Sequence, residues 1–171
     1  MKNSIEIAYY NSPLGVLKIL ADEKGIKGID FVKDKVKSIQ NSSSEIIEKC
    51  IRQLDEYFQG KRKSFELKLN PEGTEFQRKV WKELLKIPYG TTLSYGEISR
   101  RIKNPKAVRS VGQAIGRNPI SIVIPCHRVI GSDGSLTGYA SGLWRKEWLL
   151  KHEEINLNNS KNKVSKENSR Q

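Results

Sequence analysis

The chain has 171 residues, of which 36% are hydrophobic, and its formal net charge at pH 7 is +12. This length suits one domain of ordinary size or two small ones, and the spread of apolar residues excludes a disordered protein. A basic balance of this size favours a polyanionic partner, with nucleic acid ahead of an acidic membrane. A lysine-rich surface without any such partner would carry the same charge.

The cysteines and histidines are too few for a disulfide framework or a typical zinc site. The sequence holds two of each, Cys50 and Cys126, and His127 and His152, without CxxC or HxxxH spacing. No stretch reaches the roughly 20 apolar residues of a membrane span, and no signal-like segment follows Met1. We therefore expect a protein of the reducing cytoplasm, with both thiols free and with no metal, cofactor or membrane partner.

The first 70 residues predict an antiparallel sheet and one amphipathic helix. Strands are expected over 5–10, 14–20, 26–31 and 65–69. Apolar residues at helical spacing predict a helix over 45–59 with Cys50 on its buried face. Ser42-Ser43-Ser44 offers N-caps, and Glu45 is placed for a capping box from Ser42. The segment Asn70-Pro71-Glu72-Gly73 is a break in composition and marks an expected domain boundary.

The second half of the chain predicts a helix-turn-helix. Helices are expected over 74–85, 94–102, 106–115 and 143–152, the first two with capping boxes at Thr74-x-x-Gln77 and Ser94-x-x-Glu97. The second and third are joined by a very short turn at Asn104-Pro105, with several arginines nearby. This is the outline of a DNA-reading helix pair, although an ordinary helix corner has the same outline. In the last helix, Trp144, Trp148 and Leu149 are expected to pack.

The third of these helices has an unusual face for a DNA reader. Small or polar residues that permit close approach to a backbone are expected on its exposed side: Ser110, Gly112, Gln113 and Ala114. Arg109 is its one long cationic residue. At the other end of the chain, residues 157–171 are polar and lysine-rich without periodicity, so we expect a disordered basic tail.

The segment Ile124-Pro125-Cys126-His127-Arg128-Val129 carries the most chemistry. A thiol is a weak nucleophile until it becomes a thiolate, and a neighbouring imidazole or water relay commonly assists that step. The apolar run 120–124 predicts a short buried strand, which Pro125 ends, so that Cys126 starts a rigid turn. Taken alone, a Cys-His pair is more often a cysteine of the core.

With its surroundings, this segment resembles the 6-O-alkylguanine-DNA alkyltransferases, the methylated-DNA–protein-cysteine methyltransferases. The matching segments are Pro125-Cys126-His127-Arg128-Val129, Arg117-Asn118-Pro119, Ser94-Tyr95-Gly96 and Lys146-Glu147-Trp148-Leu149-Leu150-Lys151-His152-Glu153. The resemblance covers residues 74–155 strongly and residues 1–70 only in layout. It implies an α+β fold, with an N-terminal ribonuclease H-like sheet and helix over 1–70. A helical, winged-helix-like DNA-binding and active-site domain over 74–156 would follow.

The resemblance assigns catalytic roles to five residues. Cys126 would accept the methyl group, His127 would act through a bound water as its base, and Glu153 would orient the imidazole. Asn118 would brace the turn that carries the cysteine. Tyr95 would crowd the 3′ phosphate and donate a proton to N3 of the departing guanine.

The resemblance also implies a DNA surface and a base pocket. Arg109 would fill the gap left by a flipped base, because a lesion inside a duplex is out of reach. The other expected DNA contacts are Tyr95, Ser110, Gln113, Arg117 and Arg128. The expected base pocket consists of Val129, Tyr139, Ala140 and Ser141, with main-chain carbonyls of Cys126 and Val129 accepting from the 2-amino group. Some relatives have serine at Ala140, so only the main-chain amide could reach the 6-oxygen here.

The implied activity is irreversible, single-turnover transfer of the alkyl group from 6-O-methylguanine to Cys126 (EC 2.1.1.63). Transfer from 4-O-methylthymine would be slower. The partner would be double-stranded DNA that carries an alkylated base, and the protein would act as a monomer. A thioether product offers no electrophilic carbonyl to water, so each protein would act once.

Three other classes of protein share some of these sequence features. A cysteine hydrolase draws its histidine from a distant segment and turns over repeatedly. A plain winged-helix binder would leave Cys126, Glu153 and the glycine-flanked Tyr139 loop without purpose. Relatives that bind alkylated DNA without repairing it lack the cysteine, which this chain has.

Overall fold

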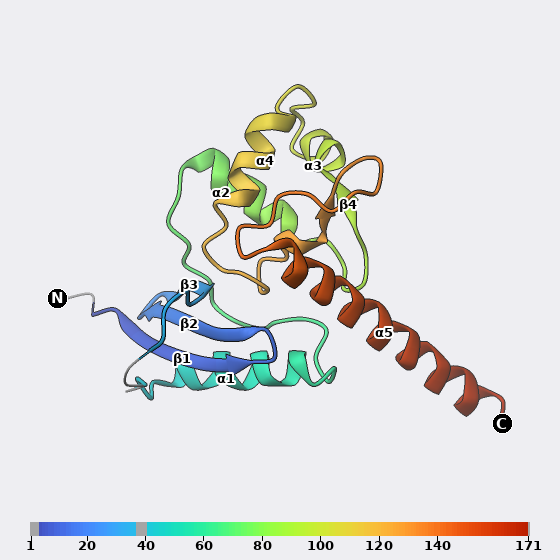
Figure 1. Ribbon diagram of the computed structural model, residues 1–171, viewed down its shortest axis with the longest axis horizontal. Helices are drawn as coiled ribbons and strands as arrows, with labels where there is room; N and C mark the ends of the chain where they lie inside the picture. Colours follow the sequence, from blue (N-terminus) through green and yellow to red (C-terminus); the bar gives the residue numbers. More distant parts are fainter. Residues whose placement is uncertain (1–3, 37–40, 171) are drawn as a thin grey trace.

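The N-terminal part of the chain is a small sheet covered on one face by a helix (Figure 1). The computed structural model describes residues 4–36 and 41–170. Strands β1 (Glu6–Ser12), β2 (Gly15–Asp22) and β3 (Gly25–Phe31) pair antiparallel in the order β1-β2-β3. Helix α1 (Glu45–Phe58) lies along this sheet. The three-stranded antiparallel sheet and its helix confirm the predicted N-terminal architecture.

Alternation of apolar side chains explains why the sheet forms here. Leu17, Ile19 and Ala21 of β2 are fully buried, because every second residue of a strand faces the same side. Opposite them, α1 buries Ile47, Leu54 and, as predicted, Cys50.

Two local predictions in this half were wrong. Ser44 caps α1 in place of Ser42, since its side chain accepts from the Ile47 amide. The segment 65–69 forms only one bridge to the sheet and no strand. The Gln53 side chain occupies the peptide hydrogen bonds that a ladder would use. Its Oε1 accepts from the Glu66 amide at 2.9 Å, and its Nε2 donates to the Glu66 carbonyl at 3.3 Å.

The C-terminal part consists mostly of helices. Its elements are α2 (Glu75–Leu84), β4 (Leu93–Ser94), α3 (Tyr95–Arg101), α4 (Val108–Gly116), the 3-10 helix η1 (Cys126–Arg128), β5 (Val129–Ile130) and α5 (Leu143–Asn168). Both predicted capping boxes are present, at Thr74 and at Ser94. Strands β4 and β5 form a parallel pair that places the start of α3 beside the end of η1.

Helices α3 and α4 form the predicted helix pair, and α2 supports it from behind. The buried Trp81 of α2 donates through Nε1 to the carbonyl of Ala114 in α4 at 2.8 Å. Ala114, which was expected on the exposed face of its helix, is therefore a core residue. The exposed side of α4 carries Arg109, Ser110 and Gln113.

The end of α5 corrects the expectation of a disordered tail. The helix does not stop at His152 but continues to Asn168. No glycine or proline follows Gly142, so each further residue extends an existing helix without the cost of a new nucleus. Of the tryptophans expected to pack, Trp148 is half-buried whereas Trp144 is 56% exposed.

Within residues 4–36 and 41–170, none of the helices combines the length and apolar character that a bilayer crossing demands.

The bond between α2 and α4 can be tested by unfolding. Trp81→Phe keeps an aromatic ring but removes the indole donor, so that the Ala114 carbonyl retains only the Arg117 amide at 3.2 Å. We expect the free energy of unfolding in urea to fall by about 1 kcal/mol, because one buried hydrogen bond is lost. The matched control is Trp144→Phe on the surface, for which the change should stay within about 0.5 kcal/mol. Equal losses in both variants would contradict this account.

Candidate active site

The chain approaches Cys126 through a series of turns, and the predicted strand over 120–124 does not form. Ile120 alone makes a bridge to the sheet, with Ile29. Ile122 then adopts a positive φ of 73°, a conformation that costs a β-branched residue on the order of 1–3 kcal/mol. The segment is apolar because it is buried, and burial alone does not make a strand.

Asn118 holds this series of turns. Its Oδ1 accepts from the Ile120 amide at 3.0 Å and its Nδ2 donates to the Ile124 carbonyl at 2.8 Å. One side chain thus satisfies two backbone groups that no sheet partner reaches. The bracing role expected for Asn118 agrees with this geometry.

Cys126 is the first residue of η1 and is only 7% exposed. Burial raises the pKa of its thiol, while a hydrogen bond from Asn118 and the positive charge of Lys146 act in the opposite direction. Because burial dominates, the resting side chain is a neutral thiol. Such a thiol needs a base before it can act as a nucleophile.

The base beside it is a buried histidine fixed by a carboxylate. His127 Nε2 lies 2.6 Å from Glu153 Oε2, and both side chains are fully buried. Burial lowers the pKa of His127 despite the carboxylate, so the resting imidazole is neutral. Donation from Nε2 to Glu153 leaves the lone pair on Nδ1, which is buried and bonded to no described residue.

Glu153 accepts four further hydrogen bonds from three residues. Arg128 donates to Oε1 at 2.7 Å and to Oε2 at 3.1 Å, and the Tyr57 hydroxyl donates to Oε2 at 2.7 Å. The amide of Gly90 donates to Oε1 at 3.1 Å. Burial alone would raise the pKa of Glu153, but His127 and Arg128 hold it well below its usual range. The carboxylate therefore stays ionised and the imidazole keeps one orientation.

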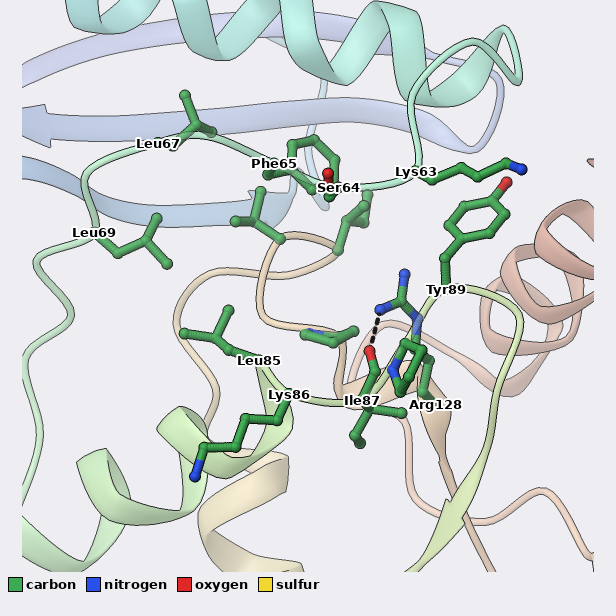
Figure 2. Close-up of a pocket in the computed structure, with 14 residues that line it drawn as sticks. Lys63, Ser64, Phe65, Leu67, Leu69, Leu85, Lys86, Ile87, Tyr89 and Arg128 are labelled. Atoms are coloured by element: carbon green, nitrogen blue, oxygen red, sulfur yellow. Dashed lines mark hydrogen bonds between the residues drawn. The ribbon is translucent and has the colours of Figure 1, made fainter. Parts of the chain in front are cut away.

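The predicted role of Arg128 at the DNA surface is corrected by these contacts. Its side chain is 6% exposed, and its Nη1 donates to the Ile87 carbonyl at 2.7 Å in addition to the bonds to Glu153 (Figure 2). A guanidinium with these partners has no free donor face for a phosphate. The cavity of about 390 Å³ beside Arg128 is lined by residues such as Phe65, Ile87 and Tyr89 and not by Cys126.

Sequence reasoning missed Lys146, which is fully buried at the active site. Its Nζ donates to the Val129 carbonyl at 2.5 Å and to the Thr137 carbonyl at 2.8 Å. Burial lowers its pKa, and the charge of Cys126 opposes that shift. A signal for it existed, because Lys146 lies three residues before Leu149 and seven before Glu153, on the helix face that becomes buried.

A cavity of about 110 Å³ adjoins the thiol and is lined by Cys126 together with Tyr139, Ala140 and Ser141. Three of the four predicted pocket residues thus meet there. The fourth, Val129, does not line the cavity, and its carbonyl accepts from Lys146. Asp30, from the end of β3, completes the wall from the N-terminal half of the chain.

Two of the predicted DNA-facing residues, Arg117 and Tyr95, lie at this cavity. Arg117, just after α4, lines the cavity itself and is exposed. Tyr95, at the start of α3, donates through its hydroxyl to the Thr137 carbonyl at 3.0 Å, beside Gly138 of the pocket loop. The last turn of α4 reaches the cavity through Ile115 and Gly116. Arg109, Ser110 and Gln113 lie on the exposed side of the same helix and do not line the cavity.

No cluster of three or more histidine, cysteine, aspartate or glutamate side chains able to hold a metal ion occurs in the described ranges.

Comparison with known proteins agrees with this arrangement in both halves of the chain. The ribonuclease-like domain of 6-O-methylguanine DNA methyltransferase matches residues 5–71, and its DNA-binding domain matches residues 75–155. The chain belongs to this family. A methylated-DNA–protein-cysteine methyltransferase of Methanosarcina acetivorans is 53% identical over 85% of this chain and 96% of its own. One from Haemophilus influenzae is 45% identical over 86% of this chain and 85% of its own.

Solved structures of family members share the fold. The Mycobacterium tuberculosis OGT, in complex with DNA, aligns with a TM-score of 0.78 at 41% identity, covering 86% of this chain and 93% of that one. The M. tuberculosis O6-methylguanine methyltransferase aligns with a TM-score of 0.77 at 39% identity, over 88% and 94% of the two chains.

The neutral state of His127 makes a prediction about stability and pH. A histidine whose pKa is lowered by folding binds its proton more readily when unfolded. Its contribution to stability is therefore present above the unfolded pKa of about 6.5 and is lost as pH falls below it. We expect the free energy of unfolding to decline from pH 7 to pH 5, and His127→Gln to flatten this decline. An unchanged slope in the variant would show that His127 is not the group responsible.

Proposed function

We propose that the protein repairs DNA by transferring the methyl group of 6-O-methylguanine to its own Cys126. The observation that carries the proposal is the thiol cavity, with a neutral histidine fixed by Glu153 and with the end of α4 and Arg117 in its lining. Its enzyme class is methylated-DNA–protein-cysteine methyltransferase (EC 2.1.1.63), in agreement with the family and with the names of its relatives.

Thiol activation follows from the two residues of η1. Nδ1 of His127 accepts the Cys126 proton through a water molecule, and the imidazolium that forms is stabilised by the ionised Glu153. The buried positive charge of Lys146 favours the thiolate over the thiol, in keeping with its effect on the pKa of Cys126. Lys146 also positions the pocket, because it holds the carbonyls of Val129 and Thr137.

Transfer proceeds by in-line displacement at the methyl carbon. The sulfur–carbon bond forms as the bond from carbon to the guanine 6-oxygen breaks, and the guanine leaves as an anion. Tyr95 supplies the proton to N3 of that anion, so its hydroxyl leaves the Thr137 carbonyl and turns to the base. The methyl thioether that remains is stable to water, so each protein acts once.

Access to the lesion requires the base to leave the duplex. Arg109, Ser110, Gln113 and Arg117 are exposed on α4 and at its end, and Arg109 fills the gap that the flipped base leaves. Ala140 offers its amide to the 6-oxygen once the base is in the pocket. We extend the proposal to 4-O-methylthymine as a slower substrate and to a protein that works as a monomer.

Intact mass after mixing with an oligonucleotide containing 6-O-methylguanine tests the stoichiometry. The protein should gain one methyl group, on the peptide that contains Cys126. Cys50 should stay unmodified, because it is fully buried and burial raises the pKa of its thiol to about 12. More than one equivalent of repaired DNA per protein would refute the single-use mechanism and favour a turnover enzyme.

Base flipping and methyl transfer can be separated with Arg109→Ala. Because unstacking costs on the order of a few kcal/mol, loss of the residue that fills the gap should slow repair of duplex DNA about tenfold or more. Free 6-O-benzylguanine needs no unstacking, so its reaction with Cys126 should be far less affected. The measurement is the ratio of the two rate constants. Equal slowing of both would show that Arg109 supports the pocket or the fold.

A further inference from the structure

The end of α5 lies beyond the part of the chain that the family match covers. The family's DNA-binding domain matches as far as residue 155, whereas α5 continues to Asn168. In Figure 1 this end of α5 runs past the end of α1 and away from α3 and α4. Whatever this extension contacts is therefore separate from the surface that leads to Cys126.

A groove of about 560 Å³ lies between the end of α1 and the α5 extension. Its lining includes three lysines, Lys61, Lys163 and Lys166, and uncharged polar residues such as Asn156, Asn159 and Ser160. We name it the α1–α5 groove. Among the described residues that line it there is no carboxylate and no aromatic or aliphatic side chain.

The walls of the α1–α5 groove are fixed by close packing between the two helices. Gly60 has a positive φ of 75° and lies directly against the Asn156 side chain, where a Cβ would collide with the amide. One turn earlier on α5, His152 Nε2 donates to the Tyr57 carbonyl at 2.8 Å. These contacts fix the base of the groove at Gly60 and Asn156, and the continuous helix α5 carries Lys163 and Lys166 outward from it.

The positive charge in the α1–α5 groove is not neutralised internally. None of its three lysines forms an ion pair with any residue in the ranges 4–36 and 41–170. From residue 157 to residue 170 the sequence carries four basic residues and one acidic residue. Lysine, asparagine, glutamine and serine side chains are the donors that proteins present to phosphate oxygens.

The absence of aromatic and aliphatic side chains from the described lining of the groove distinguishes between three anionic partners: single-stranded nucleic acid, a lipid surface and duplex DNA. Single-stranded nucleic acid binds on aromatic side chains that stack with its bases, and the lining offers none. A lipid surface is held by apolar side chains that enter the acyl region, and the lining offers none of these either. A duplex presents only its phosphates and sugars to such a surface. We propose that the α1–α5 groove binds the backbone of a second segment of duplex DNA while α4 holds the first.

Sedimentation of the full chain with excess short undamaged duplex at low salt tests this proposal. The wild type should bind two duplexes per protein. The variant Lys61→Gln, Lys163→Gln, Lys166→Gln should bind one, and the second binding step should disappear. In the wild type the association constant of the second duplex should fall as salt rises. A plot of its logarithm against the logarithm of the salt concentration should have a slope near −2.7, which is about −0.9 for each of three phosphates.

A control variant with the same change in charge, Lys24→Gln, Lys35→Gln, Lys68→Gln, lies away from the groove and should still bind two duplexes. All six lysines are exposed and form no ion pair in the described ranges, so neither variant should lose its fold. The reaction of Cys126 with free 6-O-benzylguanine reports the proposed repair chemistry separately and should be unchanged in both variants.

Three results would overturn the proposal. The first is a single duplex per wild-type protein, and the second is equal loss of the second duplex in the control variant. The third is binding of anionic phospholipid vesicles through the three lysines when only one duplex binds. Failure of the repair chemistry would appear instead as absence of alkyl transfer in the wild type, whatever the number of duplexes bound.

Discussion

The ionised carboxylate of Glu153 is the interaction on which the rest of the structure depends. It is fully buried and accepts hydrogen bonds from α1 through Tyr57, from the loop at Gly90 and from His127 and Arg128 of η1. A buried carboxylate is tolerable only when its acceptor sites are satisfied, so these four segments must meet for the chain to fold. The same requirement positions the imidazole beside the thiol. Stability of the fold and the proposed activation of Cys126 therefore rest on one group, and the N-terminal domain takes part in both through Tyr57.

Periodicity and capping were sufficient to predict most of the helices and the three-stranded sheet. The capping boxes at Thr74 and Ser94 were visible because they depend on residues three positions apart. Segments 65–69 and 120–124 were mistaken for strands because their apolar pattern reports burial and not hydrogen bonding. In each case an amide side chain, Gln53 or Asn118, takes backbone partners that a strand would need. The Asn118 contacts are local and were expected, whereas Gln53 bonds to a residue 13 positions away, which the pattern of segment 65–69 does not show.

The candidate site was predictable for residues that are neighbours in the sequence. It was less predictable for residues that only folding brings together. Cys126 and His127 are neighbours in sequence, and a family pattern linked them to Glu153. Arg128 looked like a DNA contact because arginine usually faces solvent, whereas Glu153 draws it into the core. Lys146 escaped notice for the same reason, since lysine is rarely buried unless its charge is compensated. Both errors have one cause, which is that tertiary partners decide where a charged side chain lies.

Helix α5 connects the pocket loop to the far end of the molecule without interruption. Its 26 residues correspond to about 39 Å at 1.5 Å per residue. A fluorescent dye attached near its C-terminal end would therefore move with the active site as one rigid body. Energy transfer from such a dye to a second dye on the DNA would report the direction in which the duplex leaves the protein.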